Sequence, residues 1–339
     1  MYISPLDENA RRILIDASQL YKACLEVDKE YRKYRGGMKW IKRNGREYLF
    51  RQRNSRGDGR SLGARNEQTE NTYRQFHARK GELSNKRKSL LNELKRQGRF
   101  CIAAGVNRAP KIAADIVREV HRAKSGGSAL IVIGTNALYA YENMAGVRFE
   151  SGLLATRDID LMWDADSKLS LAGLDQDEGL LALLKKADKT FDRLPKATYR
   201  AVNEKGYLVD LIKPASKTIQ KTTRSTITGN KNDLIAAEIR NLDWLYAAPP
   251  VSAVVIGSDG APAVFDVPDP RVFAAHKLWL SELPERDPMK KTRDRQQGLM
   301  VLQLLKEYLA AYVFDKTLLR GLPESLLNRA ADELAQLDV

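Results

Sequence analysis

Residues 156–164 read TRDIDLMWD and place two aspartates, Asp158 and Asp160, inside an otherwise apolar run. Because side chains alternate between faces along a β-strand, a strand here puts Asp158 and Asp160 on one face and Ile159 and Leu161 on the other. Adjacent carboxylates in an apolar strand repel each other unless a cation neutralises them. The pattern predicts a divalent-cation site. The alternative is a polar edge strand whose aspartates face water.

A second informative stretch lies upstream, at residues 131–137, with the sequence IVIGTNA. It predicts a buried strand that turns through Gly134 into a helix. The first turn of a helix exposes free N–H groups and carries partial positive charge, which favours phosphate. Gly134 would let a phosphate approach the backbone, and the Thr135 hydroxyl could donate to it. Such junctions are common in α/β cores, so this stretch alone has little specificity.

A third stretch, YLVDLI at residues 207–212, predicts another apolar strand that carries a single carboxylate, Asp210. An aspartate that is only an edge-strand charge or an ion-pair partner would give the same sequence pattern. The order of the three stretches carries the information: Gly-Thr, then Asp-x-Asp, then a strand aspartate about 50 residues later. We therefore expect the three stretches to converge.

This order resembles the nucleotidyltransferase superfamily with the DNA polymerase β-like fold. The segments GTNALYAYE, TRDIDLMWD and YLVDLI also resemble bacterial nucleotidyltransferase-domain proteins that carry a basic N-terminal extension, and the resemblance covers residues 110–300. It implies an α+β fold with a mixed sheet flanked by helices. Thr135 stands where serine is commoner in the family; the hydroxyl is retained.

The resemblance also implies roles for individual residues. Asp158 and Asp160 would hold two Mg²⁺ ions, with Mn²⁺ as a possible substitute. Asp210 would complete the shell of the second ion and help to deprotonate the acceptor hydroxyl. Gly134 and Thr135 would cradle the β- and γ-phosphates of the NTP. The implied reaction is attack of a hydroxyl on the α-phosphorus with pyrophosphate leaving, catalysed mainly by positioning and charge neutralisation.

Cations for the triphosphate are expected from the C-terminal region. Residues 276–297, HKLWLSELPERDPMKKTRDRQQ, resemble more loosely a segment of type IV toxin nucleotidyltransferases. This likeness implies that Lys277 and Arg293 reach the phosphates and that Asp294 orients Arg293. The alternative is a helix surface covered with salt bridges.

Charge is concentrated in the first third of the chain. Residues 1–100 contain 25 Lys and Arg against 12 Asp and Glu, whereas the remaining residues contain 32 against 31. A concentrated positive field attracts polyanions, so nucleic acid, and RNA in particular, is the expected partner. A merely solvated basic face is the alternative.

The densest part is the basic segment, residues 31–63, with 11 Lys and Arg and two acidic residues. Trp40, Tyr48 and Phe50 lie among the cations and could stack bases. Equally, they could form a small core beneath a hairpin. The candidate nucleic-acid ligands are Lys39, Lys42, Arg43, Arg46, Arg51 and Arg53.

Periodicity and turn signals predict three parts: a basic helix–hairpin–helix extension at 1–105, a catalytic core at 106–268 and a helical region at 269–339. In the extension we expect a hairpin at 38–52, turning at Asn44-Gly45, and an exposed loop at 53–65. Expected helices span 8–34, 67–97, 110–124, 135–144, 176–191, 270–283, 289–312 and 323–337. Expected strands span 129–134, 156–164, 196–203 and 206–213, with two short strands around 258–260.

Composition excludes several classes of protein. Two cysteines rule out a disulfide framework, and three scattered histidines argue against a zinc site. The apolar runs are too short to span a bilayer, and the N-terminus has no apolar signal core, so a cytoplasmic protein without a membrane partner is expected.

These observations favour an enzyme that transfers a nucleoside monophosphate from an NTP to a hydroxyl on RNA, such as the end of a transfer RNA. One alternative is nucleotidylation of a protein or a small molecule, although a small-molecule enzyme would not need the basic extension. Another is an inactive nucleic-acid-binding module. Retention of all three aspartates argues against the inactive module.

Overall fold

The structure is a computed structural model, and it divides into two compact units. The N-terminal unit is Arg12–Ala103, and the core unit combines Met1–Arg11 with Ala104–Val339. The first residues group with the core unit because β1 (Ile3–Pro5) pairs antiparallel with β6 (Val147–Phe149). The structure describes residues 3–53, 57–123, 130–165, 179–216, 225–315, 317 and 319–337.

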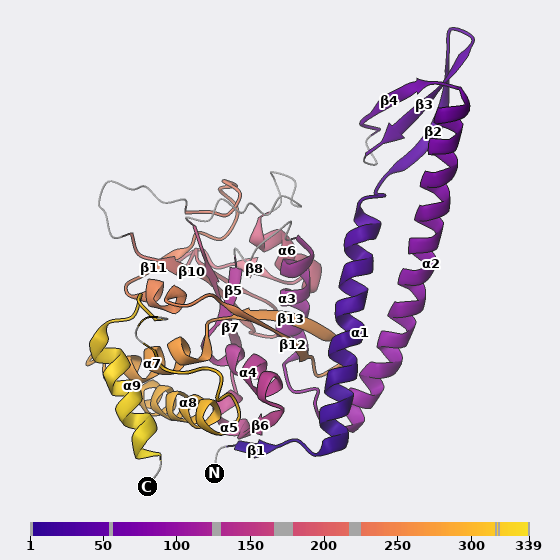
Figure 1. Ribbon diagram of the computed structural model, residues 1–339. Helices are drawn as coiled ribbons and strands as arrows, with labels where there is room; N and C mark the ends of the chain where they lie inside the picture. Colours follow the sequence, from indigo (N-terminus) through magenta and orange to yellow (C-terminus); the bar gives the residue numbers. More distant parts are fainter. Residues whose placement is uncertain are drawn as a thin grey trace. The chain divides into compact units, whose positions relative to one another are not determined.

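Two long helices, α1 (Glu8–Arg32) and α2 (Glu67–Ala103), make up most of the N-terminal unit. They run side by side in Figure 1, which confirms the expected helical hairpin. An ion pair between Asp28 and Arg87 joins them. The side chain of Asp7 accepts a hydrogen bond from the N–H of Ala10 at the beginning of α1.

A three-stranded antiparallel sheet lies at the end of this helical hairpin: β2 (Gly37–Arg43), β3 (Arg46–Gln52) and β4 (Gly59–Ala64). Asn44 and Gly45 both have positive φ, as a two-residue turn of this kind requires, so the predicted hairpin is confirmed. The predicted loop at 53–65 is wrong in part, because β4 pairs with β3 across a register shift. The glycines of β4 are typical of turns and so suggested a loop, but these residues form an edge strand.

The core unit contains a six-stranded mixed sheet in the order β5-β7-β10-β9-β8, with β11 beside β10. The central pair β7 and β10 is parallel, whereas β5 runs antiparallel to β7 and β9 antiparallel to β10. Separate from this sheet, β12 and β13 form an antiparallel hairpin. The strands are β5 (Leu130–Ile133), β7 (Asp158–Trp163), β8 (Asp192–Arg193), β9 (Arg200–Val202), β10 (Leu208–Pro214), β11 (Ala237–Ile239), β12 (Val251–Ile256) and β13 (Pro262–Val267).

The helices of the core unit follow the predicted positions with shifted ends. The expected helix at 135–144 divides into a 3₁₀ turn, η1, and then α4, while the first residues of the expected 176–191 helix lie outside the described residues. At the C-terminus α7, α8 and α9 pack together (Figure 1). The helices are α3 (Lys111–Ala123), η1 (Gly134–Ala137), α4 (Leu138–Ala145), α5 (Ser151–Leu154), α6 (Leu180–Ala187), η2 (Leu242–Tyr246), α7 (Pro270–Leu280), α8 (Pro288–Glu307) and α9 (Glu324–Gln336).

Aspartate caps and prolines fix where α7 and α8 begin. Asp269 and Asp287 accept backbone N–H bonds, and Pro270 and Pro288 occupy the first helical positions, where a missing N–H costs little. A mixed sheet with helices agrees with the predicted α+β class. Within the described residues, no helix has the length and apolar character that a bilayer crossing requires.

Candidate active site

Asp158 and Asp160 lie at the beginning of β7. Ile159 and Leu161 are fully buried in the core, while Asp158 and Asp160 on the other face keep partial exposure. The predicted alternation is therefore confirmed. β7 pairs with β5 on one side and β10 on the other, so the edge-strand alternative is wrong. The hydroxyl of Thr156 donates to the carboxylate of Asp158.

Parallel pairing brings Asp210 to the same place. In the register of β7 and β10, Asp210 lies opposite Asp160, and Leu208 opposite Asp158. Residues opposite each other on neighbouring strands point to the same face, with the strands about 4.8 Å apart. Asp160 and Asp210 therefore share one face of the sheet, although 50 residues separate them in the chain.

Arg200 of β9 holds Asp210 from the opposite side. Its Nε and Nη2 atoms donate to the two carboxylate oxygens of Asp210, each at 2.6 Å. This bidentate pair raises the pKa of Arg200 further above its usual value. Sequence reasoning missed Arg200, although a signal existed: residues 200 and 210 are equidistant from Lys205, in the turn between the two strands.

The surroundings of Asp160 disfavour its charged form. Its loss of hydration, followed by the charges of Asp158 and Asp210, raises its pKa to about 7, while Lys277 and Arg200 act in the opposite direction. A carboxylate with this environment gains free energy from a nearby cation. The donor set of Asp158 and Asp160, two hard oxygen ligands on one face, fits Mg²⁺.

The donor set has a limit at Asp210. Both of its oxygens already accept from Arg200. Among the described residues, no cluster of three or more His, Cys, Asp or Glu side chains has the geometry to hold a metal ion. The participation of Asp210 as a third ligand stays a prediction, since it needs Arg200 to release the carboxylate.

Gly134 lies directly against Asp160. It has φ of +65°, and a Cβ built on it would be 2.6 Å from Oδ2 of Asp160. Both facts call for glycine. In this structure the group that approaches the Gly134 backbone closely is thus the carboxylate of Asp160.

Thr135 connects this turn to α8. Its Oγ1 accepts from Nη2 of Arg293 at 3.3 Å and from Nε2 of Gln297 at 3.2 Å. Arg293 also donates to the carbonyl of Ala155. Two sequence-predicted nucleotide ligands, Thr135 and Arg293, therefore lie in contact.

Lys277 is buried and pairs with Asp294 at 2.6 Å. Asp294 also accepts from Arg286 at 2.7 Å. The expectation that Asp294 orients Arg293 is therefore replaced by a different arrangement: Asp294 neutralises Lys277 and Arg286. Consecutive helical side chains point about 100° apart, so Asp294 faces α7 while Arg293 faces Thr135.

A cavity of about 430 Å³ is lined by five of these residues. Gly134, Asp160 and Asp210 line it together with the cations Lys277 and Arg286. The rest of its wall is mainly apolar and includes the imidazole ring of His276 and the phenol ring of Tyr199. The remaining lining residues are Ile133, Tyr199, Ile212, Ala237, Ile239, Leu242, Leu245, Phe273 and Leu280. Arg286 and His276 are additions to the predicted site.

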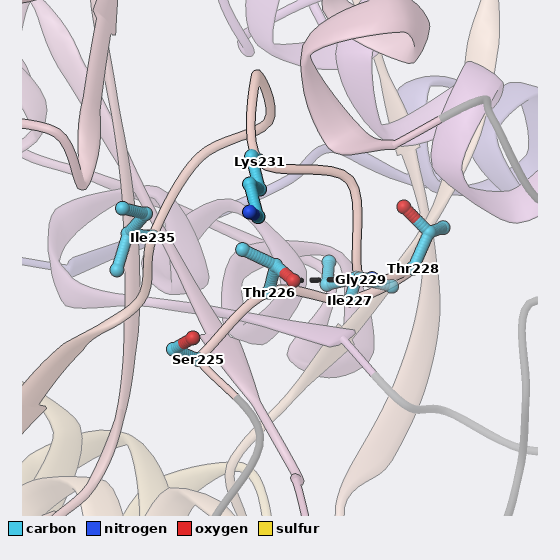
Figure 2. A pocket seen from close by; sticks show the side chains of 7 residues that line it. All are labelled: Ser225, Thr226, Ile227, Thr228, Gly229, Lys231 and Ile235. Atoms are coloured by element: carbon cyan, nitrogen blue, oxygen red, sulfur yellow. Dashed lines mark hydrogen bonds between the residues drawn. The ribbon is translucent and has the colours of Figure 1, made fainter.

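Figure 2 shows a different hollow of about 810 Å³, where Oγ1 of Thr226 accepts from the N–H of Gly229 at 3.1 Å. None of the predicted site residues lines it. Its lining residues are Ser225, Thr226, Ile227, Thr228, Gly229, Lys231 and Ile235.

The predicted nucleic-acid ligands lie in the N-terminal unit. Five of the six are exposed: Lys39, Lys42, Arg43, Arg46 and Arg53. Arg51 is engaged in the fold instead. Its guanidinium donates to the carbonyls of Gly37 and Gln52 and lies 4.5 Å from the centre of the Phe76 ring.

Of Trp40, Tyr48 and Phe50, the first belongs to a small core. Trp40 packs against Tyr73 with ring centroids 5.8 Å apart, beside the buried side chains of Met38, Leu49 and Phe76. The packing of Trp40 agrees with the alternative that these aromatics support the hairpin.

Comparison with known proteins tests whether the chain belongs to a known family. The chain has no significant match among curated proteins or among solved structures. A family model described as a nucleotidyltransferase matches residues 111–320, which contain the sheet, the three aspartates and the C-terminal cations. This match spans more than half of the chain, and we conclude that the protein belongs to this nucleotidyltransferase family.

Proposed function

We propose that the protein transfers a nucleoside monophosphate from an NTP to a hydroxyl group of an RNA, in a Mg²⁺-dependent reaction on a polymerase β-like core. The observation that carries the proposal is the register of β7 and β10, which sets Asp210 beside Asp160, whose carboxylate lies against Gly134. Family membership supports nucleotidyl transfer in general. The donor chemistry of Asp158 and Asp160 supports the metal requirement.

Each residue then has a part in the reaction. Asp158 and Asp160 hold Mg²⁺, which when bound neutralises phosphate charge and polarises the α-phosphorus. Thr135 and Arg293 bind the β- and γ-phosphates, with Lys277 and Arg286 adding positive charge from the cavity wall. The oxygen of the acceptor hydroxyl forms the new bond to the α-phosphorus as the bond to pyrophosphate breaks. Asp210, once Arg200 releases it, takes the hydroxyl proton or completes the shell of a second ion.

The N-terminal unit supports RNA as the acceptor. Exposed cations lie on and beside the β2–β3 hairpin and also along α1 and α2, and the unit carries most of the excess positive charge of the chain. Such a field binds a phosphate backbone without reading sequence. A small-molecule acceptor would not need this positive field.

The test supplies each labelled NTP with Mg²⁺ and either total RNA or cell protein. We expect label in the RNA fraction, release of pyrophosphate, and loss of both in Asp160→Asn. Asp192→Asn, an exposed aspartate of β8 in the same sheet, is the matched control and should retain the wild-type rate. Label in the protein fraction would make a protein the acceptor. Transfer by Asp160→Asn at the wild-type rate would refute the metal assignment.

A further inference from the structure

One face of α7 lines the cavity with four side chains: Phe273, His276, Lys277 and Leu280. Their spacing of three, four and seven residues places them on one helical stripe. Lys277 has its counter-ion in Asp294. His276 differs, because it brings a polar ring into the cavity without an ion-pair partner among the described residues.

His276 is nine-tenths buried, with 8% of its surface exposed. Its ring packs against Trp279, with centroids 5.4 Å apart. No hydrogen bond joins either of its ring nitrogens to a residue in the described part of the chain. A cavity-lining ring whose nitrogens have no partner among the described residues can hydrogen-bond a ligand in that cavity.

The ring is neutral at physiological pH. Burial lowers the pKa of His276 to about 3; the charges of Lys277 and Arg286 lower it too, while Asp294 acts in the opposite direction. A neutral imidazole offers one N–H donor and one nitrogen acceptor. One ring nitrogen can therefore hydrogen-bond a single polar atom on the edge of a ligand, as a donor or as an acceptor.

The surroundings narrow the class of ligand. The carboxylates and the cations Lys277 and Arg286 suit metal and phosphates, whereas Leu242, Leu245 and Phe273 offer apolar wall. A group with apolar faces and a hydrogen-bonding edge fits this wall, and the nucleobase of an NTP is such a group.

We propose that His276 hydrogen-bonds the edge of the donor nucleobase and so determines which NTP the enzyme prefers. This inference rests on the proposed function and assigns a specificity residue within the same site. A site that hydrogen-bonds one base leaves its polar atoms unpaired with another, which is a strong basis for discrimination.

The test measures binding of each of the four NTPs, with Mg²⁺, to the full chain by calorimetry. The variants are His276→Phe, which keeps a flat ring without hydrogen bonds, and His276→Gln, which keeps a donor and an acceptor. We expect the wild type to favour one NTP about tenfold over the weakest. His276→Phe should reduce that ratio to about threefold or less, and His276→Gln should restore part of it.

Tripolyphosphate, which has no base, separates a base contact from a damaged fold. Its affinity should be the same in the wild type and both variants. The inference is overturned if His276→Phe keeps the wild-type preference, or if the wild type binds all four NTPs equally. A wild type that binds neither NTP nor tripolyphosphate would instead remove the proposed function, and the inference with it.

Discussion

Arg200 and Asp210 face each other across the β9–β10 pair, and one guanidinium binds both oxygens of the carboxylate at 2.6 Å. The cation neutralises a nearly buried aspartate that the family resemblance assigns to metal. Arg200 and any metal ion at Asp210 would therefore compete for the same carboxylate.

Arg200→Ala tests that competition. Without a divalent cation the variant should be less stable by about 3 kcal/mol, because a buried carboxylate loses its partner. Mg²⁺ should raise its melting temperature more than that of the wild type, since the ion can take the place of the guanidinium. Thermal unfolding with Mg²⁺ and with chelator measures both effects. Arg79→Ala, which breaks an exposed pair with Glu82, should behave like the wild type. Equal Mg²⁺ shifts in Arg200→Ala and wild type would place Asp210 outside the cation site.

Gly134→Ala tests the contact between the glycine turn and Asp160. The added methyl group meets Oδ2 of Asp160 at 2.6 Å on a backbone with φ of +65°. We expect loss of nucleotidyl transfer and destabilisation beyond the roughly 1 kcal/mol of a strained φ. Gly206→Ala is the matched control, because Gly206 has φ of +73° and nothing lies within 4 Å of its added Cβ. Activity assays and chemical denaturation of both variants measure these effects. Similar losses of activity and stability in the two variants would show that the Asp160 contact is unimportant.

The N-terminal unit yields a prediction about salt. Replacing Lys39, Lys42, Arg43 and Arg46 with glutamine should weaken RNA binding and make the fall of log K with log salt less steep, by up to about 3 in the magnitude of the slope. Binding titrations at several salt concentrations measure the slope. Arg51→Gln should differ in kind, because Arg51 holds the sheet together and its loss should lower the stability of the unit. A slope that the four replacements leave unchanged would exclude these residues from the binding surface.

His276 predicts a pH dependence of stability. Its pKa is about 3 when folded and near 6.5 when unfolded, so the unfolded chain binds the extra proton first. Stability is therefore full above pH 6.5 and falls as the pH drops toward 3, by about 3 kcal/mol at pH 4. Denaturation of wild type and His276→Phe at pH 7 and pH 4 isolates this contribution, with the charges of Lys277, Asp294 and Arg286 present in both. An equal loss in both proteins would contradict the assignment.

Local signals predicted much of the fold. The alternation in residues 156–164, the Asn44-Gly45 turn and the proline before α3 each fix a neighbouring conformation, and the structure has the corresponding elements. Pairings between strands that lie far apart in the sequence were harder to predict. β1 pairs with β6 more than 140 residues away, and β4 adds to the β2–β3 hairpin despite its glycines.

The same division holds for the candidate site. The types and order of Asp158, Asp160 and Asp210 predicted a shared face, and the register provides it for Asp160 and Asp210. The ion-pair partners of the C-terminal cations could be identified only from the tertiary structure. Asp294 binds Lys277 and Arg286 because of how α7 and α8 pack, which periodicity within one helix does not reveal. His276 gave no signal in the sequence, because its place in the cavity depends on which groups surround it.

The parallel register of β7 and β10 also has a consequence for biosynthesis. A growing chain that has emerged only to residue 165 already contains both aspartates of β7, yet its third carboxylate has not been made. Because distant pairings form slowly and a slip of one residue would turn Asp210 to the opposite face, the centre appears late and in one step. A chain that ends before residue 210, or one in which β10 pairs out of register, would therefore lack the carboxylate that the proposed reaction assigns to Asp210.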